Sequence, residues 1–183
     1  MNARNLAAGF APFLLCVALA AGAGAPPGPS RGAALPDDDR TFMLKAAQAG
    51  LAEIELGKLA QRKGGSAAIK RLGARMAADY RKFHEALASL ARRKAVALPS
   101  ALDRESAARA GTMQAISGAP FDREYASYVV QDHREAVAEF ESAAKQAKDR
   151  DLRALARKRL PALKRHLEMA RSAAPAAATR RAP

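Results

Sequence analysis

The chain has 183 residues, a length that predicts a single domain with extensions at its ends. Aromatic residues make up only 5% of it and Trp is absent, so we expect closely spaced helices packed through small residues rather than a core of large rings. Lys and Arg number 31 against 18 Asp and Glu, a formal net charge of +13 that favours anionic partners. The alternative, that basic side chains only decorate solvated helix faces, stays open at this stage.

The first residues have the pattern of a secretory signal peptide, which we place at residues 1–23. A positive charge at Arg4 precedes a mostly apolar stretch over 6–20, and small residues at 21–23 suit cleavage. We therefore expect an exported protein, periplasmic or associated with the cell envelope, without a retained transmembrane helix. Cys16 is the one cysteine and would be removed with the signal, so no disulfide is expected in the mature chain.

The mature chain divides into three parts by composition. Residues 24–37 form a Pro/Gly-rich linker, residues 38–174 a predicted four-helix bundle domain, and residues 175–183 a disordered basic tail. Within the domain, apolar residues recur every three or four positions, the spacing of one helix face. This pattern extends over four long segments, at residues 38–63, 66–94, 121–148 and 151–174.

The first two segments form a predicted helical hairpin. The Gly-Gly pair at 64–65 is expected to end the first helix by adopting positive φ, and Ser66 to cap the second. Glu53 lies within the apolar stripe of the first helix, and Asp79 and Tyr80 interrupt the stripe of the second. Such polar side chains are costly to bury unless a partner satisfies them.

A long connection over residues 95–121, with a short helix near 102–116, leads to the third long segment. Asp122 is expected to cap that helix by accepting a hydrogen bond from a free backbone N–H. Further along the same helix, Asp132 and His133 lie inside the apolar stripe, where they repeat the pattern of the first hairpin.

The fold class predicted from these segments is all-α, a ferritin-like four-helix bundle with a long crossover between helices 2 and 3. The connection is far longer than adjacent antiparallel helices need, which favours a crossover. In that topology the two carboxylates of the first hairpin meet Asp132 and His133 near mid-bundle, with His166 about a turn away. A simple up-down-up-down order would instead bring the three histidines to one level.

The candidate site consists of the ionisable residues that interrupt the apolar stripes: Glu53, Asp79, Asp132, His133 and His166. Carboxylates and imidazoles on facing helices are typical metal ligands in bundles, so a transition metal (Fe, Mn, Cu or Zn) is one interpretation. The other is a structural polar network with Tyr80 and a core-facing Arg159, which would fix the register of Ala-rich helices. We favour the network and assign no cofactor.

Four stretches resemble a known family: GLAEIELGKLA (50–60), RMAADYRKF (75–83), FDREYASYVVQDH (121–133) and LPALKRHLEMA (160–170). They are similar to signature segments of a bacterial family of exported helical domains, domain-of-unknown-function family 4142. The resemblance implies a ferritin-like fold and an exported domain, but no activity. Glu53, Asp132, His133 and His166 match family positions, whereas relatives often have Asp-His at the positions of Asp79 and Tyr80.

The function predicted from the sequence is that of a structural, envelope-associated binding protein. Anionic envelope components such as lipid headgroups are the expected partners, and export disfavours nucleic acid. Nothing resembles a nucleophile with its base, a phosphate-binding Gly-rich loop or a zinc-finger spacing, which favours a non-enzymatic role. The alternative is a ferritin-like metal-binding protein with a redox or storage role.

Overall fold

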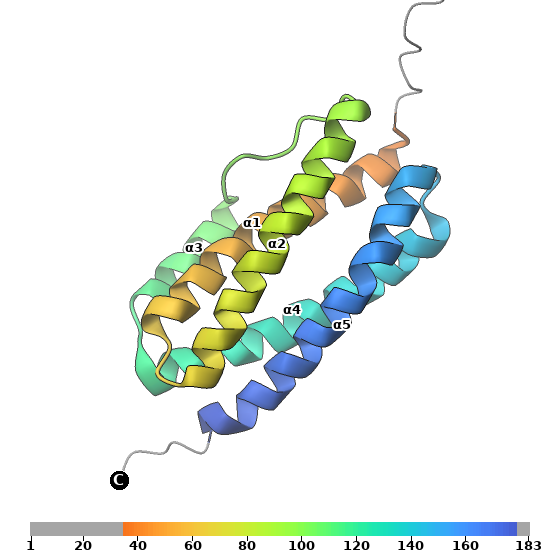
Figure 1. The fold of residues 1–183 in the computed structure, drawn as a ribbon. Helices are drawn as coiled ribbons and strands as arrows, with labels where there is room; N and C mark the ends of the chain where they lie inside the picture. The colour runs from red at the N-terminus through yellow and green to blue at the C-terminus, as the bar shows by residue number, and fades with distance from the viewer. Residues whose placement is uncertain (1–34, 179–183) are drawn as a thin grey trace, which may run out of the picture. The chain divides into compact units, whose positions relative to one another are not determined.

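Five α-helices make up residues 35–178, the part of the chain that the computed structural model describes (Figure 1). They are α1 (Asp37–Lys63), α2 (Ala67–Arg93), α3 (Arg104–Gln114), α4 (Gly118–Gln146) and α5 (Arg150–Ala178). The predicted all-α class is confirmed, with no strand in this part of the chain. The expected signal peptide, almost all of the linker and residues 179–183 lie outside the described residues.

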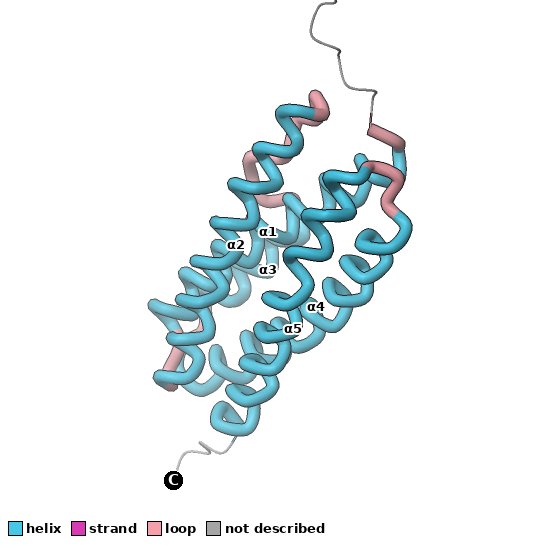
Figure 2. The backbone as a smooth tube through the Cα atoms, turned by 45° about the vertical axis from the view of Figure 1, so that its right-hand side comes forward, coloured by secondary structure: helices cyan, strands magenta, loops and turns pink. Residues whose placement is uncertain are grey.

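The four long helices pack as two hairpins (Figure 1, Figure 2). α1 lies against α2 and α4 against α5, while α2 also contacts α5, α1 contacts α4, and α3 lies against α1. Each long helix contributes fully buried side chains to one core, for example Met43, Leu72, Tyr125 and Leu163. Within the described residues, no helix is both long and apolar enough to cross a membrane.

Small residues allow α1 and α2 to approach closely, as the composition predicts. A Cβ atom added to Gly57 would lie 2.7 Å from the carbonyl oxygen of Gly73. One added to Gly73 would lie 2.5 Å from the Cβ of Ala60. Both distances are shorter than van der Waals contact, so this helix pair depends on the absence of side chains at the two glycines.

The Gly-Gly turn between α1 and α2 has a different role from the one predicted. Gly64 has a φ of −58°, and among the described glycines only Gly118 has a positive φ, of 63°. A Cβ atom on Gly65 would lie 2.9 Å from the Cα of Gly118, so the turn needs glycine because the start of α4 passes close to it. Ser66 caps α2 as expected, accepting a hydrogen bond from the N–H of Ile69 at 3.2 Å.

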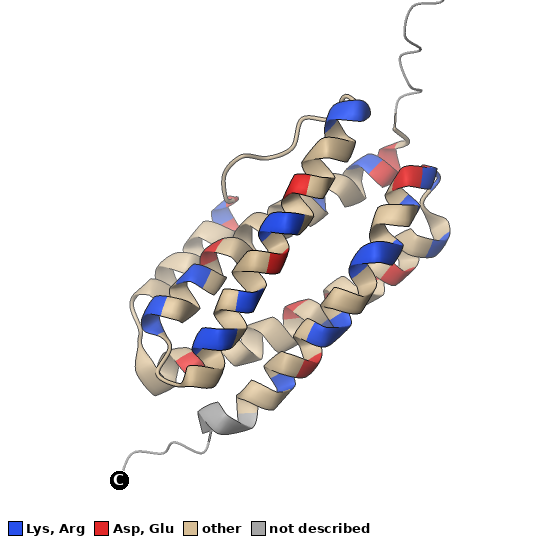
Figure 3. Ribbon diagram, in the orientation of Figure 1, with Lys and Arg blue, Asp and Glu red and all other residues tan. Residues whose placement is uncertain are grey.

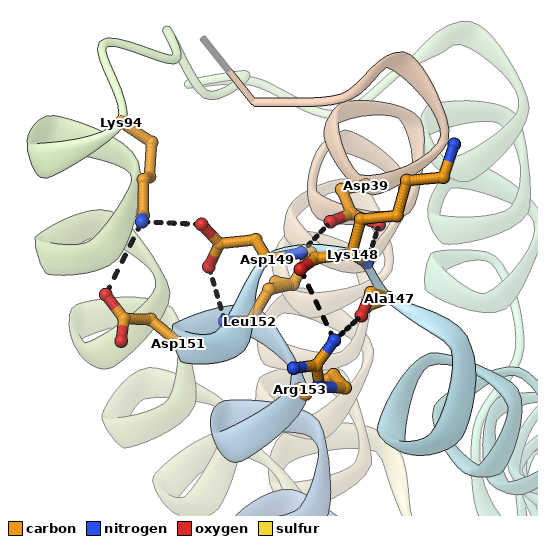
Figure 4. Close-up of polar contacts among 8 residues, drawn as sticks. All are labelled: Asp39, Lys94, Ala147, Lys148, Asp149, Asp151, Leu152 and Arg153. Carbon is orange, nitrogen blue, oxygen red and sulfur yellow. Dashed lines mark hydrogen bonds and ion pairs between the residues drawn. The ribbon is translucent and has the colours of Figure 1, made fainter. Parts of the chain in front are cut away.

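Two buried aspartates bind backbone groups of distant turns. Asp122 does not cap its own helix; it lies inside α4, and its two oxygens accept hydrogen bonds from the N–H groups of Gly65 (2.7 Å) and Ser66 (2.8 Å). Asp39, in the first turn of α1, accepts from Lys148 (3.1 Å) and Asp149 (2.6 Å) in the turn between α4 and α5 (Figure 4). Each carboxylate thus joins the two hairpins.

The turn between α4 and α5 is also bound from α2. The ammonium of Lys94, just past the end of α2, lies 2.5 Å from the Asp149 carboxylate and 3.5 Å from that of Asp151 (Figure 4). Asp149 also accepts from the N–H of Leu152 at 2.9 Å, which caps the start of α5. The end of α2 and the start of α1 are therefore both held at this one turn.

Candidate functional site

The candidate residues lie in a polar cluster inside the bundle, which we call the polar centre. It draws side chains from all four long helices: Glu53, Asp79, Tyr80, Asp132, His133, Arg159 and His166. Periodicity brings them there, because each occupies a position in or beside the apolar stripe of its helix. Most are buried, whereas Asp79 and Asp132 keep contact with solvent.

His133 is a neutral imidazole at the middle of the polar centre. Burial, reinforced by the neighbouring His166 and Arg159, lowers the pKa of His133 to about 3. Its Nδ1 lies 3.1 Å from the carbonyl oxygen of Val129, which can only accept, so Nδ1 carries the proton. Nε2 then accepts a hydrogen bond from the Tyr80 hydroxyl at 3.2 Å.

Glu53 and Asp132 form a pair of carboxyl groups beside the His133 ring. Burial and the charge of Asp132 raise the pKa of Glu53 well above its usual value, and burial also raises the pKa of Asp132. Their oxygens lie 4.0 Å (Glu53) and 3.4 Å (Asp132) from Nδ1 of His133, but these are not ion pairs because the ring is neutral. The pair resists carrying two negative charges, and the upward shift of the pKa is larger for Glu53, the fully buried member.

Asp79 and His166 form a second pair that joins α2 to α5. Nε2 of His166 lies 2.9 Å from the Asp79 carboxylate, which also accepts from Arg75 at 2.7 Å. Partial burial opposes ionisation of Asp79, yet the bonds from His166 and Arg75 lower its pKa. Asp79 is therefore ionised, Nε2 of His166 donates to it, and the buried Nδ1 of His166 is left as an acceptor without a partner among the described residues.

Arg159 places a buried cation next to both pairs. Its guanidinium lies over the rings of Tyr80, 4.2 Å from the centroid, and Phe83, 4.9 Å away, and Nη1 donates to the carbonyl oxygen of Asp79 at 3.3 Å. Its positive charge lowers the pKa of both Glu53 and His133, and so favours the charged form of the first and the neutral form of the second. Nε and Nη2 of Arg159 have no hydrogen-bond partner within residues 35–178.

The five predicted residues thus divide into two groups. Ligand atoms of Glu53, Asp132 and His133 all lie within 4.8 Å of one another, a spacing compatible with a metal ion. Asp79 and His166 are not part of that group, although the ring of His166 lies 5.4 Å from that of His133. The polar network and the three-residue group therefore share His133.

Two participants were not singled out from the sequence. Tyr128 donates to Asp132 at 3.5 Å, and Arg75 completes the Asp79 pair. Both stand four residues from their partner along a helix, so an i,i+4 search starting from each candidate carboxylate would have found them.

Comparison with protein families matches residues 24–173 to the family described as "Domain of unknown function (DUF4142)". The match covers most of the chain and confirms the resemblance found in the four sequence stretches. Comparison with curated proteins and with solved structures found no match. The family match therefore carries no activity.

Proposed function

The chain belongs to the DUF4142 family, and from this premise we propose that it is an exported domain that binds anionic lipid headgroups of the cell envelope through the outer faces of α2 and α5. The single observation that carries the proposal is the concentration of unburied positive charge on these two neighbouring helices. The polar centre, in this account, stabilises the arrangement of the helices that present the charge.

Lys and Arg recur along the ribbons of α2 and α5 (Figure 3), and most of these residues are exposed. On α2 they are Lys70, Arg71, Arg75, Arg81, Lys82, Arg92 and Arg93; on α5 they are Arg150, Arg157, Lys158, Lys164, Arg165 and Arg171. Exposed acids on the same helices are Glu85 and Glu168. Because α2 and α5 are in contact, their charges add to one basic surface, which we call the α2/α5 face.

The helices on the other side of the bundle carry a much smaller excess of positive charge. The exposed basic residues of α1 and α4 are Arg40, Lys45, Lys58, Arg62, Arg123, Arg134 and Lys145. They are offset by exposed acids on the same helices, namely Asp37, Asp38, Glu124, Glu135 and Glu139. Most of the excess positive charge thus lies on one side of the bundle, which general decoration of solvated helix faces would not produce.

An anionic lipid surface suits such a face. Each Lys or Arg near a membrane with anionic headgroups contributes about 1 kcal/mol of attraction, and no pocket is required. Export, which we expect from the signal-like pattern at residues 1–23, favours lipid over nucleic acid as the available polyanion. The basic tail predicted at residues 175–183 would add to the same attraction.

We also propose the ferritin-like bundle with its crossover as the architecture behind this face. Three contacts support it: Asp122 of α4 binds the turn between α1 and α2, Asp39 of α1 binds the turn between α4 and α5, and Lys94 binds the same turn. The end of α2 and the start of α4 then lie at opposite ends, so residues 94–117 run the length of the bundle. In this order α2 and α4 are parallel.

Co-sedimentation with vesicles tests the proposal. The mature protein is mixed with vesicles of phosphatidylcholine containing phosphatidylglycerol, and with vesicles of phosphatidylcholine alone as the control. We expect binding to the anionic vesicles in low salt and its loss as NaCl rises to about 0.5 M, where charges are screened within about 4–5 Å. Equal sedimentation with both kinds of vesicle, or none with either, would exclude the proposal.

A further inference from the structure

We propose that Glu53, Asp132 and His133 form a binding site for one divalent transition-metal ion, reached from an acid-lined depression between α1, α3 and α4. The three side chains come from two helices, and their nearest ligand atoms lie within 4.8 Å of one another. Donor atoms around a shared Zn²⁺ or Mn²⁺ ion are about 3 to 4 Å apart, so a small contraction would complete the site.

Glu53 provides the observation that points to a ligand. The residue is 0% exposed, and neither carboxyl oxygen has a hydrogen-bond partner among residues 35–178. The other two buried acids of the described residues, Asp39 and Asp122, each accept two backbone N–H bonds. Among the buried acids of residues 35–178, Glu53 is thus the one that no backbone N–H satisfies, and an added cation would take that role.

A route for a cation leads to Asp132, the partly exposed member of the group. A depression of about 430 Å³ between α1, α3 and α4 has Asp132 and Tyr128 in its lining. Its other acids are Asp103, Glu105, Glu124 and Glu135, and they outnumber its two basic residues. In a chain with a net charge of +13, this local excess of carboxylates draws cations to one place.

The donor set indicates the class of metal. Two carboxylates and one imidazole suit Zn²⁺, Mn²⁺ or Fe²⁺ better than Ca²⁺ or Mg²⁺, which prefer oxygen ligands alone. The nitrogen nearest both carboxylates is Nδ1 of His133, which donates to the Val129 carbonyl. Metal binding at Nδ1 therefore shifts the ring proton to Nε2, where it faces the Tyr80 oxygen 3.2 Å away.

Titration calorimetry with Zn²⁺ and Mn²⁺ tests the site in the mature protein prepared without a His tag. We expect one ion per chain in the wild type and a loss of affinity of about tenfold or more in Glu53→Gln, the effect of disabling a metal ligand. Glu85→Gln makes the same side-chain change at an exposed position on α2 and should bind as the wild type does. Binding that Glu53→Gln leaves unchanged would overturn the proposal.

A second measurement remains decisive if Glu53→Gln does not fold. Imidazole ¹⁵N spectra of the wild type are recorded during addition of Zn²⁺. The proposal predicts that the Nδ1 and Nε2 signals of His133 exchange their protonated and unprotonated character, while those of half-buried His84 stay in place. A response at His84 without one at His133, or no stoichiometric response at either, would contradict the site.

Discussion

Nε2 of His166 on α5 donates a hydrogen bond to the Asp79 carboxylate on α2 over 2.9 Å. The bond crosses between the two helical hairpins, and the acceptor is ionised because its pKa is lowered by His166 and Arg75 in spite of partial burial. Together with the bond from Arg159 to the Asp79 carbonyl oxygen, it joins α2 to α5, the helices that carry the basic surface.

Replacing Asp79 with Asn should therefore destabilise the fold. The variant keeps the shape of the side chain but loses the charge that strengthens the bond from His166, and we expect the free energy of unfolding to fall by about 1.5 kcal/mol. Urea denaturation followed by circular dichroism measures the change. Glu85→Gln, an exposed acid on the same helix, should change stability little. Equal stability of Asp79→Asn and Glu85→Gln would show that the bond contributes nothing.

Asp39 should matter more to stability than its neighbours in sequence. Asp39→Ala leaves two backbone N–H groups of the turn between α4 and α5 without their acceptor, and we expect a loss of about 2 to 3 kcal/mol. Asp37→Ala, two residues earlier and exposed, removes the same charge from the same helix terminus. If both variants unfold at the same urea concentration, the two buried hydrogen bonds of Asp39 add nothing to the free energy of unfolding.

Two glycine-to-alanine changes should act in opposite directions. Gly73→Ala places a Cβ atom 2.5 Å from that of Ala60, so we expect a loss of about 2 kcal/mol or more from overpacking between α1 and α2. Gly111→Ala lies on α3 with no atom within 4 Å of the added Cβ, and should stabilise by about 0.5 to 1 kcal/mol through helix propensity. Thermal melts decide, and a stabilised Gly73→Ala would mean that the two helices are not in close contact.

The ion pair of Lys94 and Asp149 should make stability depend on acid pH. Partial burial raises the pKa of Asp149, but the bonds from Lys94 and from the Leu152 N–H outweigh it and lower the pKa below its usual 3.8. Because the unfolded chain binds this proton at higher pH than the folded one, the contribution is fully present above about pH 4 and is lost as the pH falls through the folded value.

Lys94→Met tests this contribution. Without the ammonium the folded pKa of Asp149 returns toward its usual value, so the plot of unfolding free energy against pH should become shallower below pH 4. Urea midpoints measured between about pH 2 and pH 7 compare the two proteins. If stability depends on pH in the same way in both proteins throughout that range, the ion pair with Lys94 is not what lowers the pKa of Asp149.

Helix periodicity predicted the fold class and the four long helices, because burial of one face per helix is encoded locally in the sequence. The reason predicted for the Gly-Gly turn was wrong. Gly65 must lack a side chain because Gly118, a residue far away along the chain, lies close to it. The role of Asp122 was missed for the same reason: a carboxylate at a helix start predicts a local cap, whereas its actual partners lie at the start of α2.

For the polar centre, the sequence identified the candidate residues but not how they divide. All five predicted side chains point to the bundle interior or its edge because they interrupt apolar stripes. Their separation into a three-residue group and an Asp79–His166 pair depends on how each helix is rotated about its axis and shifted along it. The periodicity of apolar residues does not determine the rotation or the shift to better than about one helical turn. Which nitrogen of His133 carries the proton depends on its contact with the Val129 carbonyl oxygen, and that contact is set by the rotamer of the ring.

The central claim is that the α2/α5 face binds anionic lipid, and matched neutralisation of two faces tests it most directly. One variant replaces four exposed basic residues of that face with Gln: Arg71, Lys82, Lys158 and Arg165. The other replaces four exposed basic residues of α1 and α4, so that net charge changes equally: Arg40, Arg123, Arg134 and Lys145. Binding to vesicles that contain phosphatidylglycerol should weaken by about tenfold or more in the first and by less than about threefold in the second, since only charges near the membrane contribute. Equal weakening in both variants would show that net charge alone, and not this face, governs the association.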